Sequence, residues 1–355
     1  MECCPEQRQE VSRLGLSCTR TKLFLLLLLI DLTVVGLLLH TLRPLITLLY
    51  RNQELFAARG TLPSSNLLPQ NLSEYPNPSG IPLILHQTAA TENIPERWQN
   101  SQQSCVEVYA NYQYMLWTDE SARDFISKHY PWFLPTWDTY TFPIQRADAL
   151  RYFVLYHYGG IYLDMDTWCI QPIPVQALLN DNPGRDLAIF KSTTPTGVTN
   201  DFLVTTPRHP VYGAAIAKLP DSAQFTHPWA RLQPYSAIMA SAGPMFLSLV
   251  LKEYLLGQQN QQQQSRPFPW PEGIEIINKT ELAPYITDLE SSTWHHSDAK
   301  VLMWLGKRPW LWYTLGLGVL ATGLYMIDYL FVILYVRSSR RAVSQTCGTK
   351  SAKKA

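Results

Sequence analysis

The sequence has almost no excess of charge of either sign. Its 29 lysines and arginines balance 28 aspartates and glutamates, which gives a formal net charge of +1 over 355 residues. Proteins that bind nucleic acid through its phosphates carry a surplus of positive charge, so this balance gives no reason to expect nucleic acid as a partner. No internal repeat is visible either, which argues against a repeat architecture.

Cysteine is scarce as well. The chain has six cysteines, and only Cys105 and Cys169 lie between the two long apolar stretches described below. This excludes a disulfide-rich scaffold and leaves one possible intrachain bridge in the central part. From the sequence alone, that disulfide and a pair of buried free thiols remain open alternatives.

Long apolar stretches are present near both ends of the chain. Residues 23–42 and residues 310–336 each reach the length of about 20 residues that a membrane-spanning helix needs. No site for signal peptidase follows the first stretch, so we interpret it as a signal anchor rather than a cleaved leader. The second stretch is then a second transmembrane helix.

Charged residues and sequons predict the orientation of these spans. Lysine and arginine gather in the tails, residues 1–22 and 337–355, and the positive-inside rule therefore places both tails in the cytosol. The central part is then lumenal. The glycosylation sequons at Asn71 and Asn278 agree with that location.

The central part is predicted to consist of a linker followed by one domain. Residues 43–80 contain repeated prolines and are expected to form a stem. In residues 81–305, short apolar strands such as 81–87 and 112–118 alternate with helices, which predicts a single α/β domain with a mainly parallel sheet. Residues 192–201 are expected to form a loop within it.

Two aspartates follow a short β-prone run near the middle of the chain. Asp164 and Asp166 are two residues apart, so they project to the same face of a strand. Hard oxygen ligands of this kind bind Mg²⁺ or Mn²⁺ and leave coordination positions open for a diphosphate. The alternative is a solvated pair of aspartates in a turn.

A strongly predicted helix comes just before these aspartates. Residues 144–157 begin after Pro143 and end before Gly159, which is the usual asymmetry of proline and glycine at helix ends. Asp148 and Arg151 are three residues apart on one face. They form either a surface ion pair or, because this helix leads directly into the strand with the aspartates, a ligand-facing pair.

Several longer motifs resemble the D-x-D glycosyltransferases of family 32. They are residues 84–88 (ILHQT), 116–120 (LWTDE), 130–134 (YPWFL), 146–152 (RADALRY) and 156–166 (YHYGGIYLDMD). Further motifs, at residues 199–201, 207–210, 243–248 and 292–295 together with the two spans, resemble the branch that mannosylates inositol phosphorylceramide.

This resemblance implies a fold and an activity. The fold is of the GT-A type, a single nucleotide-sugar-binding α/β domain. The activity is a retaining, metal-dependent transfer of mannose from GDP-mannose to inositol phosphorylceramide in sphingolipid biosynthesis. The location is the Golgi membrane, with the catalytic domain in the lumen. The expected metal is Mn²⁺, with Mg²⁺ as the alternative.

Matched motif by motif, the resemblance also implies roles for individual residues. Asp148 and Arg151 are expected to contact the donor sugar and diphosphate. Asp164 and Asp166 are expected to hold the ribose and the metal, and these four are the expected catalytic residues. His295 is a further expected metal ligand, although Ser291 stands where the family tends to have glycine. The remaining expected donor-binding residues are His86, Trp117, Asn200, Asp201 and Gly243.

The membrane region suggests contacts with the acceptor and with a partner. Lys307 and Arg308, near the lumenal mouth of the second span, either grip the lipid phosphate or belong to an ordinary aromatic belt with snorkelling cations. Asp31 and Asp328 lie inside the two spans, where acids are costly without a partner. We therefore expect contact with another membrane subunit, in agreement with the regulatory membrane subunit that the resemblance implies.

The sequence disfavours three alternative functions. A glycoprotein-directed mannosyltransferase of the same family usually has a single anchor, whereas this chain has two spans. An inactive scaffolding subunit is disfavoured because all four expected catalytic residues are present. A D-x-D phosphatase needs threonine or valine where this chain has Trp168.

Overall fold

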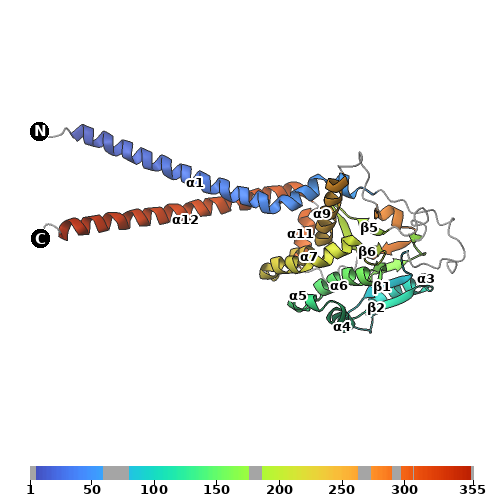
Figure 1. The fold of residues 1–355 in the computed structure, drawn as a ribbon. Coiled ribbons are helices and arrows are strands. Elements are labelled where there is room, and N and C mark those ends of the chain that lie inside the picture. The colour runs from blue at the N-terminus through green and yellow to red at the C-terminus, as the bar shows by residue number, and fades with distance from the viewer. Residues whose placement is uncertain are drawn as a thin grey trace. The chain divides into compact units, whose positions relative to one another are not determined.

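The computed structural model describes residues 5–58, 80–175, 186–262, 273–289, 297–306 and 308–352 (Figure 1). The chain divides into two units. An α/β unit comprises Pro44–Lys300, and a helical unit comprises Met1–Arg43 together with Val301–Ala355.

The helical unit contains the apolar stretches near the two ends of the chain. Helix α1 (Pro5–Tyr50) includes the first stretch, helix α12 (Pro309–Ala352) includes the second, and α11 (Ser297–Gly306) precedes it. The segments Lys22–Tyr50 and Trp310–Arg337 are long and apolar enough to cross a membrane. In each segment, none of the most apolar stretch is buried against the rest of the protein. The predicted apolar helices near both ends are thus confirmed. Among the described residues a third segment, Pro234–Gln258, is similarly apolar, but 56% of its most apolar stretch is buried.

A six-stranded sheet forms the centre of the α/β unit, in the order β2-β1-β3-β6-β5-β7. Its strands are β1 (Ile84–Thr88), β2 (Gln113–Trp117), β3 (Gly160–Leu163), β5 (Ala188–Ser192), β6 (Val198–Thr205) and β7 (Ile274–Ile277). Neighbouring strands are parallel except at β6, which is antiparallel to β3 and β5. A second small sheet pairs β4 (Thr167–Cys169) with β8 (Ile286–Asp288).

The predicted α/β class with a mainly parallel sheet is confirmed. The loop predicted at residues 192–201 is wrong in part, because residues 198–201 begin β6. Val198 pairs with Ser192, the last residue of β5, and the carbonyl oxygen of Asp201 accepts a hydrogen bond from the amide of Asp164. Those partners are not visible in the local sequence.

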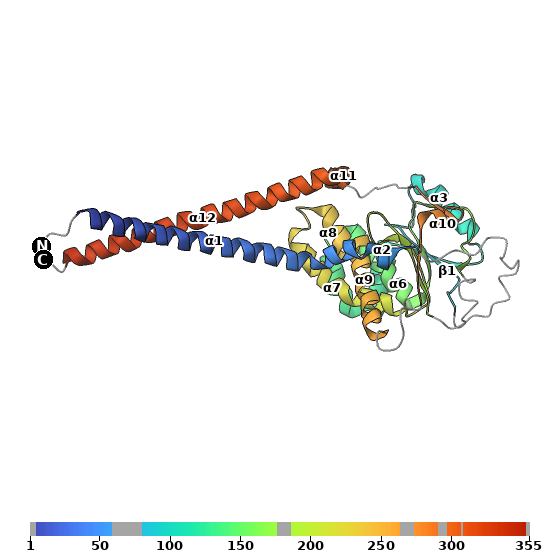
Figure 2. The same cartoon turned by 90° about the horizontal axis from the view of Figure 1, so that it is seen from above.

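Helices cover both faces of the sheet (Figure 2). Along β3, Tyr162 belongs to the core shared with α6, α7 and α9, whereas Ile161 and Leu163 belong to the core shared with α3. This alternation is the ordinary period of two of a strand, and a sheet covered on both faces has apolar strands throughout. The helices are α2 (Asn52–Phe56), α3 (Glu96–Val108), α4 (Asp119–His129), α5 (Leu134–Thr139), α6 (Pro143–Tyr158), α7 (Pro210–Thr226), α8 (Pro234–Ser241), α9 (Pro244–Gln262) and α10 (Lys279–Leu282), with 3₁₀ turns at Pro131–Phe133 (η3) and His227–Trp229 (η5).

Two glycines set the path from α6 into β3. Gly159 and Gly160 have φ values of 69° and 99°, which side chains disfavour. A Cβ on Gly160 would lie 2.6 Å from the carbonyl oxygen of Ile84, and one on Gly159 would lie 2.7 Å from the nitrogen of Pro207. The absence of side chains therefore lets α6 end tightly against the sheet and fixes where the next residues of the chain emerge.

The first core residues of the α/β unit precede the sheet. Leu48, Leu55 and Phe56 are buried with at most 4% exposure. Lys252 Nζ on α9 donates a hydrogen bond to the carbonyl oxygen of Pro44 at 2.9 Å. The range expected to be a stem thus begins with a stretch that packs into the α/β unit.

A disulfide joins Cys105 of α3 to Cys169 of β4. Of the two alternatives that the sequence leaves open, the structure has the bridge. Both cysteines are buried, and β4 begins directly after Asp166. The bridge therefore ties the segment that follows the D-x-D motif to α3.

Replacing Cys105 with serine is expected to lower the free energy of unfolding by about 2–5 kcal/mol, because the bridge restricts a long loop of the unfolded chain. The two cysteines are 64 residues apart in sequence. Thermal unfolding of the purified protein with and without reductant measures the effect. Reductant should destabilise the wild type and leave Cys105→Ser unchanged, and an equal effect on both would contradict the role of the bridge.

Candidate active site

The D-x-D segment emerges from the central strand β3 and is held by its neighbours on two sides. The amide of Asp164 donates to the carbonyl oxygen of Asp201 on β6 at 3.0 Å, and the amide of Leu289 donates to the carbonyl oxygen of Asp166 at 3.0 Å. The amide of Thr167 closes the turn by donating to the carbonyl oxygen of Asp164 at 3.0 Å. The backbone of both aspartates is therefore fixed before any ligand binds.

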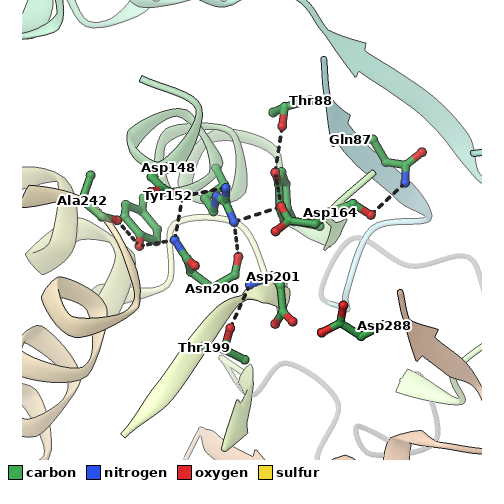
Figure 3. Close-up of polar contacts among 12 residues, drawn as sticks. Gln87, Thr88, Asp148, Tyr152, Asp164, Thr199, Asn200, Asp201, Ala242 and Asp288 are labelled. Atoms are coloured by element: carbon green, nitrogen blue, oxygen red, sulfur yellow. Dashed lines mark hydrogen bonds and ion pairs between the residues drawn. The ribbon is translucent and has the colours of Figure 1, made fainter. Parts of the chain in front are cut away.

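Arg151 of α6 lies between two carboxylates, those of Asp148 and Asp164, both of which are labelled in Figure 3. Its Nη2 is 2.7 Å from Asp148 Oδ1 and its Nη1 is 3.1 Å from Asp164 Oδ1. The side chains of Arg151 and Asp148 are only 2% and 7% exposed, whereas that of Asp164 is 31% exposed. The pair on α6 thus joins the D-x-D segment instead of facing solvent.

Asn200 of β6 completes the network around Asp148. Its Nδ2 donates to Asp148 Oδ1 at 3.0 Å and to the hydroxyl of Tyr152 at 3.3 Å. Its carbonyl oxygen accepts a hydrogen bond from Arg151 Nη1. The hydroxyl of Tyr152 donates in turn to the carbonyl oxygen of Ala242 at 2.6 Å, which places Gly243, the next residue, beside the network through the backbone.

Tyr162 and Thr88 hold the other side of Asp164. The hydroxyl of Tyr162 donates to Asp164 Oδ1 at 2.9 Å and lies 2.9 Å from Thr88 Oγ1. The guanidinium carbon of Arg151 is 4.6 Å from the centre of the Tyr162 ring. Tyr162 was not among the residues expected at the site, although it stands two residues before Asp164 and the period of two in a strand points to it.

Negative charge exceeds positive charge in this network. Burial raises the pKa of Asp164 to about 7, against the lowering effect of Arg151, and the carboxylates of Asp201 and Asp166 add to the rise. Burial also raises the pKa of Asp148, although Arg151 and Asn200 oppose it. Burial disfavours the charge of Arg151 too, but Asp164 and other neighbours outweigh it and raise its pKa. A cation bound here would relieve the repulsion among the carboxylates.

A second buried charge cluster borders the first. Lys191 of β5 is 8% exposed, forms an ion pair with Asp201, and lies 3.6 Å from Asp288 Oδ2 at the end of β8. The carboxylates of Asp201 and Asp288 point into a common space (Figure 3). These residues and Thr167 line a pocket of about 120 Å³. Lys191 and Asp288 were not among the expected site residues, because they are far from the D-x-D motif in sequence.

The donor set fits a hard divalent cation. Asp164 and Asp166 present carboxylate oxygens, and the buried Oδ1 atom of Asp201 has no hydrogen-bond partner. Among the described residues, no group of three or more histidine, cysteine, aspartate or glutamate side chains is arranged to hold a metal by itself. Oxygens from a diphosphate could complete such a site, because Mg²⁺ and Mn²⁺ commonly share substrate phosphates with few protein ligands.

His86, expected to bind the donor, has partners for both of its ring nitrogens. Its Nε2 donates to the carbonyl oxygen of Gly159 at 2.9 Å, and its Nδ1 accepts from Trp117 Nε1 at 3.1 Å. Burial lowers the pKa of His86 to about 4, so the ring is neutral. This ring orients Trp117 and the end of α6, and it leaves neither nitrogen for a ligand.

Acid is expected to destabilise the protein through His86. The unfolded chain binds a proton at this residue near pH 6.5, whereas the folded protein binds it only near pH 4, so stability is lost as the pH falls through this window. The cost is about 3 kcal/mol. Thermal unfolding between pH 7 and pH 4 should show the gap between wild type and His86→Gln shrinking by this amount. A gap that stays constant would contradict the buried neutral histidine.

A larger pocket of about 350 Å³ opens next to Thr88, at the ends of β1 and β2 and the start of α6. Its walls are mainly apolar and include the rings of Trp98 and Trp117. Asp119 and Arg146 are its charged lining residues among those described. Because Thr88 also contacts Tyr162, the pocket adjoins the side of the network that holds Asp164.

The remaining predicted residues lie elsewhere. Asn278 caps α10 by accepting a hydrogen bond from the amide of Glu281 at 2.8 Å. In the helical unit, the guanidinium of Arg308 stacks over Trp304 at 4.2 Å. Asn71, His295 and Lys307 lie outside the described residues.

Comparison with known proteins identifies the family. Residues 95–186 match the family described as the glycosyltransferase sugar-binding region containing the DXD motif. The chain is 36% identical over 273 residues to inositol phosphoceramide mannosyltransferase 3 of Schizosaccharomyces pombe, covering 77% of this chain and 71% of that protein. The chain belongs to this glycosyltransferase family. The matched region contains the DXD motif, Asp164-Met165-Asp166, and the preceding pair on α6.

Two further relatives of this DXD glycosyltransferase are mannosyl phosphorylinositol ceramide synthase SUR1 of Saccharomyces cerevisiae and inositol phosphoceramide mannosyltransferase 2 of Schizosaccharomyces pombe. Each is 38% identical over 232 residues, or 64% of this chain. The chain spans 55% and 62% of their respective lengths. Among solved structures, the PaToxG glycosyltransferase is similar at a TM-score of 0.37 and 17% identity, covering 53% of this chain and 74% of that one.

Proposed function

We propose that this DXD glycosyltransferase transfers mannose from GDP-mannose to inositol phosphorylceramide, with retention at the anomeric carbon. One observation carries the proposal: a chain similar along most of its length to an inositol phosphoceramide mannosyltransferase assembles Asp148, Arg151 and the D-x-D segment into one buried network. The inactive scaffold is disfavoured because such a network of buried charges costs stability and has no evident use outside catalysis.

Each part of the network has a place in this reaction. Asp164 and Asp166 would hold a divalent cation, Mn²⁺ or alternatively Mg²⁺, which supplies charge stabilisation to the leaving diphosphate. Arg151 fixes the carboxylate of Asp164 and adds positive charge beside it. Asp148 and the carbonyl oxygen of Asn200 orient Arg151, and the Oδ1 atom of Asp201, which has no hydrogen-bond partner, is a further candidate ligand.

The 350 Å³ pocket is the proposed site of the nucleoside. Its volume lies at the lower end of the range for small-molecule sites, and an aromatic lining suits a flat base. Thr88 and Tyr162 link it to Asp164, so a nucleotide in this pocket would direct its diphosphate toward the D-x-D segment. Trp117 would contact the nucleoside because its ring lines this pocket. His86 would not contact it, but would orient the ring of Trp117 through their hydrogen bond.

The two apolar helices support a membrane location for the enzyme. We propose that residues 23–42 and 310–336 cross the Golgi membrane, that residues 81–305 act in the lumen, and that both tails are cytosolic. A sphingolipid acceptor and a regulatory membrane subunit fit this arrangement, with Asp31 and Asp328 as the proposed points of contact for the subunit. The stacking of Arg308 on Trp304 supports a belt at the membrane surface rather than a dedicated phosphate site.

Acceptor choice tests the proposal. The full-length protein, purified into vesicles, is incubated with labelled GDP-mannose, with and without Mn²⁺, and with either inositol phosphorylceramide or a mannosylated glycoprotein. The label should enter the lipid only when Mn²⁺ is present. Label entering the glycoprotein while the lipid stays unlabelled would overturn the acceptor assignment.

A further inference from the structure

Away from the active site, the α/β unit has an exposed apolar projection formed by residues 225–232, here called the 225–232 patch. It consists of the end of α7, the turn η5 and the start of the connection to α8. Phe225 is 71% exposed and Leu232 is 87% exposed, and among the large apolar side chains described in this unit only Tyr50, at 90%, exceeds both. The ring of Trp229 lies beside Phe225, with centroids 6.1 Å apart, and Arg231 is exposed next to it.

The 225–232 patch is held in shape by buried residues and backbone bonds. Thr226 and Ala230 are each 1% exposed, and Trp229 Nε1 donates to the carbonyl oxygen of Phe225 at 2.9 Å. The amide of Leu232 donates to the carbonyl oxygen of Trp229 at 3.0 Å. Leaving two large apolar side chains in water forgoes about 1.5–3 kcal/mol each. A fold that presents them on an ordered turn therefore points to something that covers them.

The position of the patch within the unit indicates what covers it. The amide of Tyr235, three residues after Leu232, donates to Asp298 Oδ2 at 2.8 Å, and the unit ends shortly afterwards at Lys300, where the chain continues toward the second apolar helix. At the other end of the unit, Pro44 is bonded to α9, and α7 packs against both α8 and α9. The end of α7 that carries the patch thus belongs to the same layer as α8 and α9 (Figure 2), and the contacts to Asp298 and Pro44, next to the two ends of the α/β unit, are made at α8 and by α9.

We propose that the 225–232 patch docks on the lipid bilayer. Phe225, Trp229 and Leu232 suit the interfacial region, where aromatic and apolar side chains gather, and Arg231 suits the lipid phosphates. Docking would give the α/β unit a third attachment besides its two chain connections and would hold it close to the headgroup layer. The inference rests on the proposed membrane attachment but does not depend on the proposed reaction.

Site-specific photolabelling tests this docking in the full-length protein. A photoreactive benzoylphenylalanine is placed at position 225, at position 232, or at the control position 170, and each protein is reconstituted into vesicles of radiolabelled phosphatidylcholine. Ile170 is a matched control because it is 51% exposed and directly follows Cys169, a member of the core on the α3 face of the sheet. All three side chains are more than half exposed, so a larger side chain can extend into solvent at each position.

The expected result is at least about tenfold more radiolabelled lipid on positions 225 and 232 than on position 170. Only a side chain that lies in the bilayer interface stays in contact with lipid. Equal labelling at all three positions would overturn the proposal. Cross-linking of positions 225 and 232 to a second copy of the chain, without lipid, would assign the patch to self-association instead. Photolabelling does not require catalysis. The result can therefore be interpreted even if the protein does not transfer mannose.

Discussion

Replacing Arg151 with methionine is expected to lower the free energy of unfolding of the α/β unit by about 3–5 kcal/mol, because it leaves buried carboxylates without their cation. Asp148 is 7% exposed and has no other cation beside it in the described network, and Asp164 loses the same partner. The variant should also lose mannosyl transfer, since Asp164 would no longer be held. Chemical or thermal unfolding of the purified full-length protein measures the first effect.

The chain offers a matched control for this experiment. Arg123 and Asp138 form an ion pair at 2.9 Å, but their side chains are 50% and 48% exposed. Exposed pairs contribute about 0–1 kcal/mol, so Arg123→Met should unfold almost like the wild type. An equal loss in both variants would contradict the account of Arg151. Adding Asp148→Asn to Arg151→Met should restore part of the stability, because it removes one of the uncompensated charges.

Replacing Asp166 with asparagine is expected to lower the rate of mannosyl transfer by about 10²–10³-fold or more, the size of effect seen when one group that stabilises developing charge is removed. The backbone of Asp166 is held by Leu289, so the fold should persist and the melting temperature should change little. Asp164→Asn should lose transfer to a similar extent and should also lose stability, because its Oδ1 atom accepts from Arg151 and Tyr162.

Asp138→Asn serves as the control for these two variants, since its side chain is 48% exposed and its carboxylate forms a surface ion pair with Arg123. It should transfer mannose at the wild-type rate. Steady-state transfer assays on the four proteins give the comparison. A full rate in Asp166→Asn, with the melting temperature unchanged, would remove the D-x-D segment from the chemistry.

Local features of the sequence were sufficient to predict the elements that carry the site. The structure places α6 at Pro143–Tyr158, close to the predicted helix at residues 144–157, because proline at a helix start and glycine at its end act on the neighbouring backbone. Strand β1 (Ile84–Thr88) overlaps the strand predicted at residues 81–87 for a similar reason. A short apolar run followed closely by a helix is typical of a buried strand in an α/β domain. The shared strand face expected for Asp164 and Asp166 does not form, because β3 ends at Leu163 and both aspartates lie in the turn that the amide of Thr167 closes on the carbonyl oxygen of Asp164.

Contacts made by distant segments could not be predicted in this way. Lys191 reaches Asp288 only because β5 and β8 converge on the D-x-D segment, and nothing near Lys191 in the sequence indicates this. The partners of His86 come from Gly159 and Trp117, so the motif that contains it does not reveal whether the ring faces a ligand. The sequence could not decide between a disulfide and two free thiols for the same reason. Only the packing of α3 against β4 brings Cys105 to Cys169.

If this protein is a catalyst whose D-x-D segment transfers mannose to a lipid, formation of the mannosylated lipid must depend on Asp166. The most direct test reconstitutes purified wild type and Asp166→Ala with labelled GDP-mannose, inositol phosphorylceramide and Mn²⁺, and measures the label in mannosylated lipid. The account predicts product with the wild type that disappears on chelation of the metal, and none with Asp166→Ala at an equal melting temperature. Equal amounts of product from both proteins, or none from the wild type, would contradict it.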